Sequence, residues 1–220
     1  MGDRVHHVVS SLQVGGAERL VVDLACAQMR AGLSPSIVDL GRDDGPLVAA
    51  ARDLGIGVTR VGRLRSSILR TAALAAMIAG RDRVLHLHNP WALRAVLPIL
   101  PTLRGRVIYT RHGAHPYNHG PWRMIHRFAR RFIHRVTFVT DDARVSYAMA
   151  HGSSWERHVV IENGVRVASE VPARSPPVRL RIGAVGRLVE LKGQHVLLDA
   201  IAGLDPAARS RVASQPGPRP

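Results

Sequence analysis

The sequence predicts an α/β protein with a Rossmann-like parallel sheet that has helices on both faces. Apolar segments rich in β-branched residues alternate with helical segments along most of the chain, which is the order of a β-α-β protein. The predicted strands lack a clean alternation of polar and apolar residues, and this indicates burial on both sides, as in a parallel sheet. With 220 residues, the chain is longer than one typical domain and barely long enough for two.

The individual elements follow from the local patterns. A strand over 4–10 leads to Gly15 and Gly16 and then to a helix over 17–30, which Gly32 ends. The predicted apolar stripe of this helix consists of Leu20, Val21, Leu24 and Ala27. Further strands are expected over 36–40, 57–61, 84–88, 106–110, 136–140 and 158–161, and further helices over 47–54, 66–79, 91–100, 121–134 and 143–151.

The composition changes after residue 165, where we place the end of the first domain. Proline, serine and alanine dominate residues 166–178, which predicts an interdomain linker. A strand over 179–185, a loop over 186–193 and a helix over 194–201 then predict the first strand-helix unit of a second Rossmann-like domain, over 179–220. The last segment, 210–220, has no helical or strand period, so we expect an irregular tail there.

Composition excludes several classes of protein. The longest apolar run, 72–79, is far too short to span a bilayer, and no signal-peptide pattern is visible at the N-terminus. A single cysteine, Cys26, excludes a disulfide framework and any CxxC motif. We therefore expect a cytoplasmic protein.

The charge balance favours anionic partners. There are 31 basic and 16 acidic residues, which give a formal net charge of +15, and Lys192 is the only lysine. Such a charge attracts nucleotide phosphates, anionic lipid headgroups or nucleic acid. Aromatic residues make up only 4% of the chain, so we do not expect nucleic acid as the partner.

Ligands of open parallel sheets bind beyond the carboxyl ends of the strands. This rule directs attention to the loops over 11–16, 88–90, 112–119 and 162–165. Gly15 and Gly16 let the backbone approach a ligand at the start of a helix, although a tight turn without a ligand explains the pair equally well. Arg187 and Lys192 flank the loop of the second domain and could hold a diphosphate, or could be two solvated surface cations.

Two histidines fall at the ends of predicted strands. His88 and His112 could each act as a base, a hydrogen-bond donor or a substrate clamp, or could be structural residues. His86 shares a strand face with His88, but no carboxylate or third ligand lies nearby in the sequence, so we expect no metal site there.

One helical segment, 121–135, is basic and amphipathic. Its predicted apolar face consists of Trp122, Ile125, Phe128, Ala129, Phe132 and Ile133. Its predicted basic face consists of Arg123, Arg127, Arg130 and Arg131. This composition suits an anionic membrane surface, but a helix that packs its apolar face on the sheet would show the same pattern, and we favour the latter.

Five segments together resemble the GT-B glycosyltransferases, specifically the group 4 type of retaining, nucleotide-sugar-dependent enzymes. They are HHVVSSLQVGGAERLVVDLA, LHLHNP, YTRHG, VIENGV and RIGAVGRLVELKGQHVLLDAI. They follow the order of the family over 4–204, and the VGGAE turn and the GRLxxxKG segment carry the resemblance. The family has two Rossmann-like domains, of which the first usually holds the acceptor and the second the donor.

The resemblance implies a role for each candidate residue. Gly15 and Gly16 would lie over the donor phosphates or the reacting sugar, and Arg187 and Lys192 would bind the donor diphosphate without a metal ion or other cofactor. His112 would be the catalytic residue, a histidine near the sugar. His88, with Asn163 and Gly164, would lie on the acceptor side or at the hinge. Trp122, Arg127, Arg130 and Arg131 would be candidates for docking at the inner membrane face, since several members are peripheral membrane proteins.

The predicted function is transfer of a hexose from a nucleotide sugar to a cell-envelope or exopolysaccharide acceptor, either a carbohydrate or a lipid-linked one. The Glu-x7-Glu element with which the family grips its donor is absent after Lys192. We therefore expect a truncated donor domain and doubtful activity. The alternatives are a non-enzymatic acceptor-binding or membrane-associated remnant, and another GT-B enzyme such as a sugar-nucleotide epimerase.

Overall fold

The computed structural model describes residues 4–64, 66–78, 83–103, 106–113, 115, 117, 119–152, 155–165, 180–186, 188–210 and 212–213. Contacts divide the chain into unit 1, Met1–Val165, and unit 2, Arg166–Pro220. Each unit is described by itself. Within the described ranges, no helix combines the length and the apolar character that crossing a bilayer requires.

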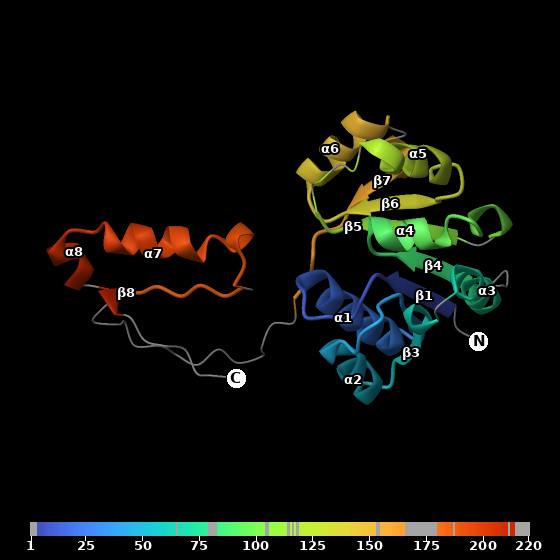
Figure 1. The fold of residues 1–220 in the computed structure, drawn as a ribbon, viewed down its shortest axis with the longest axis horizontal. Coiled ribbons are helices and arrows are strands. Elements are labelled where there is room, and N and C mark those ends of the chain that lie inside the picture. The colour runs from blue at the N-terminus through green and yellow to red at the C-terminus, as the bar shows by residue number, and fades with distance from the viewer. Residues whose placement is uncertain are drawn as a thin grey trace. The chain divides into compact units, whose positions relative to one another are not determined.

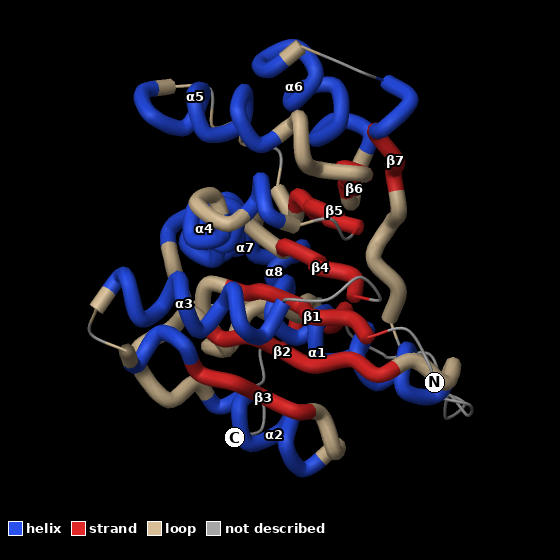
Figure 2. Tube along the Cα trace, turned by 90° about the vertical axis from the view of Figure 1, so that its right-hand side faces the viewer, coloured by secondary structure: helices blue, strands red, loops and turns tan. Residues whose placement is uncertain are grey.

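Unit 1 contains one parallel sheet of seven strands in the order β3-β2-β1-β4-β5-β6-β7, as Figures 1 and 2 show. The strands are β1 Arg4–Val9, β2 Ser34–Asp39, β3 Gly57–Arg60, β4 Arg83–Leu87, β5 Arg106–Arg111, β6 Arg135–Phe138 and β7 His158–Val160. This confirms the predicted fold class. The chain proceeds outward from β1 to β3 and then returns to β4 on the other side of β1, so the direction of winding reverses between β1 and β4.

Helices cover both faces of this sheet. They are α1 Gly16–Arg30, α2 Pro46–Asp53, α3 Ser67–Ile78, α4 Pro90–Val96, α5 Gly120–Ala129 and α6 Asp141–His151. Short 3-10 helices span Val61–Arg63, Leu100–Thr102 and Trp155–Arg157. Side chains of α1 and α2 form one apolar cluster with Val9 and Ile37, while α3, α4, α5 and α6 contribute to a second cluster with Val8 and Leu87. Val8 and Val9, which are neighbours in β1, therefore belong to different clusters, because successive side chains of a strand point to opposite faces of the sheet.

The predicted stripe of α1 is wrong by one position. The buried residues are Val21, Val22, Ala25 and Cys26, whereas Ala27 is exposed. A period of 3.6 residues fits two neighbouring stripes in this helix. Packing against Val9 and Ile37 selects the stripe that contains Val21 and Val22.

Two other helices are shorter than predicted. Helix α4 ends at Val96 rather than at residue 100, because Pro98 lacks the N–H that would continue the helix. Helix α5 ends at Ala129 rather than at residue 134. The chain turns there so that Ile133 becomes buried and the His134 N–H donates to the Val107 carbonyl, which leads into β6.

Unit 2 contains β8 Leu180–Arg181, a 3-10 helix over Glu190–Lys192, α7 Gln194–Ala202, α8 Pro206–Ser210 and β9 Val212–Ala213. The predicted helix over 194–201 is confirmed, but the strand predicted over 179–185 is reduced to two residues. The tail is not wholly irregular, because β9 pairs in parallel with β8 through Leu180 and Val212. A strand of two residues has no detectable period, so the sequence pattern missed it.

Candidate functional site

A cavity of about 240 Å³ lies in unit 1 at the carboxyl ends of β1, β4 and β5. This is the point where the direction of winding reverses, which is where open α/β sheets bind ligands. The residues of the lining that bear on its chemistry are Glu18, His88, Trp91, Arg111, His112 and Tyr117. Three of the four loops singled out from the sequence contribute to this region or adjoin it, whereas the lining includes no residue of 162–165.

The glycine pair precedes the first turn of α1, beside this cavity. Gly15 is the N-cap in extended conformation, and no side chain caps the helix. A Cβ on Gly15 would collide with the Glu18 carboxylate, whereas a Cβ on Gly16 would meet open space. Only the flexible end of the Glu18 side chain would have to move for a Cβ at position 15, so the turn does not require glycine there, and the space beside position 16 is open.

Arg111 supplies the positive charge of the cavity, and the sequence interpretation did not single it out. It is the last residue of β5, is almost fully buried, and donates to the carbonyl oxygens of Gly113 and His115. Its guanidinium lies 5.0 Å from the centre of the Tyr117 ring. Its Nη1 has no partner among the described residues, so one donor of a buried cation stays available.

His88 and His112, both predicted site residues, lie together in this cavity and are hydrogen-bonded. His88 Nδ1 is 3.1 Å from His112 Nε2, and on its other side His88 Nε2 is 2.9 Å from His7 Nδ1. His7 Nε2 in turn lies 2.7 Å from Gln28 Oε1 of α1. A continuous row of side chains therefore connects helix α1 with the cavity.

Burial keeps these histidines neutral. Desolvation lowers the pKa of His7 and of His112 to about 4 each, and lowers the pKa of His88 well below its usual range. Neighbouring imidazoles add to the effect at His88, because a second positive charge nearby would be repelled. At neutral pH each ring consequently has one N–H and one lone pair.

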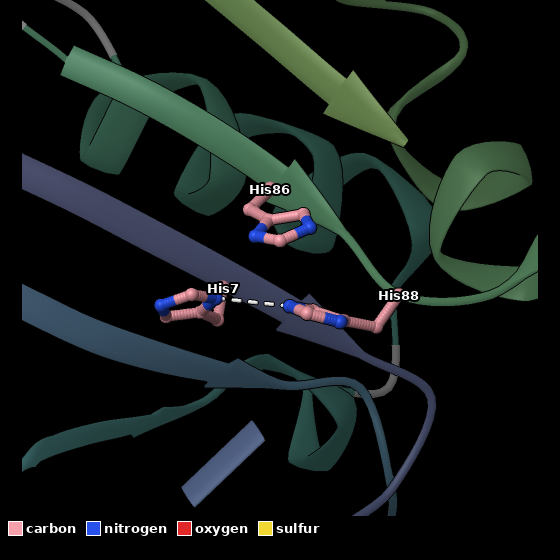
Figure 3. Close-up of side chains that lie close together, drawn as sticks. All are labelled: His7, His86 and His88. Carbon is pink, nitrogen blue, oxygen red and sulfur yellow. Dashed lines mark hydrogen bonds between the residues drawn. The ribbon is translucent and has the colours of Figure 1, made fainter. Parts of the chain in front are cut away.

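The same row brings a third histidine beside the pair noted in the sequence. His7 pairs with His86 in the register of β1 and β4, and one ring nitrogen from each of His7, His86 and His88 lies within 4.8 Å of the others. Figure 3 shows the three rings together and the bond between His7 and His88. The sequence shows no third ligand near His86 and His88 along the chain, whereas His7 comes from a different strand that pairs with β4.

Among the described residues, these three histidines could hold a metal ion, but the distances favour hydrogen bonds. Two nitrogens on one tetrahedral zinc ion, at bond lengths of about 2.0 to 2.1 Å, lie about 3.3 Å apart. His7 Nδ1 and His88 Nε2 are 2.9 Å apart, which is an ordinary hydrogen-bond distance. His86 Nε2 has its own partner in Thr110 Oγ1, at 2.6 Å.

An aromatic cluster lies beside the cavity. Trp91 and Trp122 meet edge to face with ring centres 5.0 Å apart, and Tyr117 packs on Trp122 in the same way at 5.3 Å. The Arg94 guanidinium lies 5.6 Å from the Trp91 ring. Trp122, a predicted membrane-docking residue, is half-buried in this cluster.

The basic helix α5 mainly packs on the domain, as the favoured interpretation expected. His126 and Ala129 are buried, and His126 Nδ1–H donates to the Trp122 carbonyl. Phe128 was assigned to the buried face but is 38% exposed, because His126 occupies that face instead. Three of the predicted docking residues, Arg127, Arg130 and Arg131, are exposed.

A larger cavity, about 440 Å³, lies beside this helix at the amino ends of β6 and β7. Arg130 and Arg131 line it together with Arg157 and His126. This cavity lies at the amino ends of the strands, whereas open α/β sheets bind ligands at the carboxyl ends. Its larger size alone therefore does not make it the functional site.

Two further candidates in unit 1 do not line the cavity of about 240 Å³. Asn163 and Gly164 follow β7 and are exposed. In unit 2, Gly186 packs against the side chain of Lys192, which is exposed just before α7. Arg187 is outside the described residues.

The reversal of winding with a cavity at its carboxyl edge defines unit 1 as a Rossmann-like domain, a fold that it shares with solved GT-B glycosyltransferases. Within this class the chain belongs to Glycosyltransferase Family 4, whose sequence model matches residues 14–169. No curated protein matches the sequence.

Solved glycosyltransferase structures share the fold at low sequence identity. HepE of Anabaena, solved in complex with UDP-glucose, matches with a TM-score of 0.74 and 20% identity over 96% of this chain and 59% of its own. The lipopolysaccharide outer core galactosyltransferase WaaB matches with a TM-score of 0.59 and 13% identity, over 96% of this chain and 67% of its own. MurG of Acinetobacter baumannii matches with a TM-score of 0.55 and 11% identity, over 96% of this chain and 66% of its own. The chain thus spans 59% of the length of HepE.

Proposed function

We propose that this chain acts in glycosyl transfer, moving a hexose from a nucleotide-sugar donor to a cell-envelope or exopolysaccharide acceptor. The observation that carries the proposal is the cavity at the reversal point of a family 4 domain, which contains a buried cation, Arg111, beside a neutral imidazole, His112. The UDP-glucose complex of HepE supports a nucleotide sugar as the donor class.

In this proposal, cations stabilise the departing nucleotide. As the bond between the anomeric carbon and the phosphate oxygen breaks, negative charge develops on the diphosphate. Lys192 and Arg187 of unit 2 are the proposed diphosphate ligands, and the open space beside Gly16 admits the donor at the uncapped start of α1. The proposal invokes no metal ion and no further cofactor.

His112 is the proposed catalytic residue, in contact with the sugar. A neutral imidazole can exchange hydrogen bonds with a hydroxyl without competing for the diphosphate through charge. Its partner His88 is buried behind it rather than exposed to an acceptor, which favours a supporting role for His88 over the predicted acceptor-side one. We propose Asn163 and Gly164 as hinge residues because they follow β7 in the chain.

Binding of nucleotides to the whole chain tests the donor. We expect UDP and UDP-glucose to raise the melting temperature, and we expect Lys192→Ala to weaken binding about tenfold or more, as for loss of one charge-assisted hydrogen bond. Arg30→Ala is the matched control, since Arg30 is an exposed cation at the far end of α1. If no nucleotide or nucleotide sugar shifts the melting temperature, the non-enzymatic acceptor-binding alternative is favoured.

A second proposal concerns location: we propose that the protein is cytoplasmic and peripheral at the inner membrane face. Exposed Met124 and half-exposed Phe128 accompany the exposed Arg127, Arg130 and Arg131 on and just after α5. Apolar side chains among arginines are typical of segments that lie on anionic bilayers.

Sedimentation with anionic vesicles tests this location. Each cation near the surface contributes about 1 kcal/mol, so Arg130→Glu with Arg131→Glu should weaken partitioning about thirtyfold or more. Arg42→Glu with Arg52→Glu is the control, because these exposed residues lie in and near α2. Equal effects of the two double variants would indicate attraction by net charge alone and would refute docking through α5.

A further inference from the structure

Four side chains from four parts of unit 1, namely α1, β1 and the segments that follow β4 and β5, form one row of hydrogen bonds that ends at the cavity. The row runs from Gln28 Oε1 to His7 Nε2 at 2.7 Å, from His7 Nδ1 to His88 Nε2 at 2.9 Å, and from His88 Nδ1 to His112 Nε2 at 3.1 Å. Both nitrogens of His7 and of His88 are engaged. Figure 3 shows the central bond of this row, between His7 and His88.

Gln28, at the start of the row, determines which atom donates the proton in every hydrogen bond of the row. An amide oxygen only accepts, so His7 Nε2–H donates to Gln28 Oε1. A neutral imidazole has one N–H, so His7 Nδ1 accepts from His88 Nε2–H, and His88 Nδ1 accepts from His112 Nε2–H. We infer that Gln28, His7 and His88 are positioning residues that hold His112 in the tautomer with a proton on Nε2 and a bare Nδ1.

The opposite direction would require either the Gln28 amide nitrogen in place of Oε1 at His7, or a charged His7. If His7 were an imidazolium, its Nδ1–H would donate to His88 Nε2, and the proton of His112 would move to Nδ1. Burial opposes that charge, since it lowers the pKa of His7 to about 4. His86 does not interfere with the row, because its Nε2 bonds to Thr110 Oγ1 instead.

The end of the row is an acceptor without a donor. His112 Nδ1 is buried and has no hydrogen-bond partner within the described residues. An unsatisfied buried acceptor costs free energy, and a ligand in the cavity that His112 lines can supply the missing donor. A hydroxyl can donate to Nδ1, whereas an ionised phosphate oxygen cannot. The row would thus select a hydroxyl-bearing part of the ligand at His112, a consequence that rests on the proposed function.

The tautomer itself can be measured without any ligand. Long-range proton–nitrogen correlation spectra of the ¹⁵N-labelled whole chain distinguish a protonated from a bare ring nitrogen, and the His112→Asn spectrum assigns the signal. At about pH 8, above the ordinary histidine pKa of about 6.5, we expect His112 as a single tautomer with the proton on Nε2. A proton on Nδ1 in the unaltered protein overturns the inference.

Substitution at Gln28 tests whether the direction is set at the far end of the row. Gln28→Met keeps the volume and removes the acceptor, so His112 should shift from one tautomer to a mixture. Gln28→Glu keeps an acceptor and should restore the single tautomer at about pH 8. His115 and His119 are exposed controls from the adjoining loop, whose spectra should not change.

A merely structural role of Gln28 gives a different result. If Gln28→Met destabilises the fold but leaves the His112 tautomer unchanged, the positioning role is refuted. Failure of nucleotide sugars to bind would refute the proposed function and leave the tautomer measurement standing. The two hypotheses therefore fail in separate experiments.

Discussion

Unit 1 and unit 2 differ in how well they bury their apolar side chains. In unit 1 both faces of the parallel sheet are covered, and residues such as Leu87 are fully buried. In unit 2, helix α7 has no buried residue, and Val185 and Leu188 are 106% and 91% exposed. A sheet of two short strands offers too little surface to cover a helix. The difference teaches that the same strand-helix pattern buries its apolar side chains only where neighbouring strands cover them.

Helices α4 and α6 of unit 1 differ from α7 of unit 2 at their beginnings, although α1, α2 and α5 have no side-chain cap either and Asp205 caps α8. In unit 1, Asn89 and Thr140 accept hydrogen bonds from the first turns of α4 and α6, from Ala92 N at 2.8 Å and from Ala143 N at 3.2 Å. In unit 2, the N-cap residue of α7 is Gly193, which has no side chain that could cap the helix. Side-chain capping thus adds to burial in unit 1 and is missing from α7.

The largest expected effect is acid unfolding of unit 1. Burial lowers the pKa of His7, His112 and His126 to about 4, and that of His86 to about 3. The unfolded chain takes up these protons below about pH 6.5, so the free energy of unfolding falls as the pH falls from about 6.5 toward 4. Each histidine can contribute up to about 1.4 kcal/mol per pH unit.

Urea unfolding at several pH values, followed by tryptophan fluorescence, measures this effect. All three tryptophans of the chain are in unit 1, at positions 91, 122 and 155, so the signal reports on that unit. Replacing the exposed His115 and His119 by glutamine is the control and should leave the pH dependence unchanged. A free energy of unfolding that is constant between about pH 7 and 5 would contradict neutral burial of the histidines.

A matched pair of leucine substitutions tests the burial difference directly. Leu87→Ala removes a side chain that is 0% exposed and should cost about 2 to 5 kcal/mol, whereas Leu198→Ala in α7 removes one that is 66% exposed and should cost less than about 0.5 kcal/mol. Urea unfolding followed by circular dichroism reports on the helices of both units. Similar costs for the two variants would mean that α7 is covered in solution, which would remove the contrast between the units.

Most of the fold was predictable because it depends on local patterns. The alternation of strands and helices indicated the parallel sheet, and the rule for the carboxyl ends led to Gly15, His88 and His112 before their positions were known. The phase of the α1 stripe was not predictable, because a periodic pattern cannot distinguish Val22 from its neighbour Leu20 as the residue that faces the sheet. Packing against strands that are distant in the sequence decides this.

The row of hydrogen bonds could not be predicted from the sequence either, because it also depends on packing between distant segments. His7 meets His88 only because β1 pairs with β4, and Gln28 meets His7 only because α1 crosses that part of the sheet. Arg111 lies one residue before the predicted His112, yet its burial depends on the loop that follows β5. The exposed position of Asn163 likewise followed from no pattern in the sequence.

A smaller difference between the units concerns the cap of α6. Thr140→Ala removes the oxygen that accepts from Ala143 N and should cost about 1 kcal/mol of unfolding free energy, measured by urea unfolding at neutral pH. Thr140→Ser keeps the oxygen and removes only the methyl group, so it should retain most of the stability. If both variants cost the same, the methyl contact and not the cap stabilises α6, and the capping difference between this helix and α7 would have no energetic weight. If only Thr140→Ala is costly, side-chain capping contributes to unit 1 a stabilisation that Gly193 cannot provide to α7.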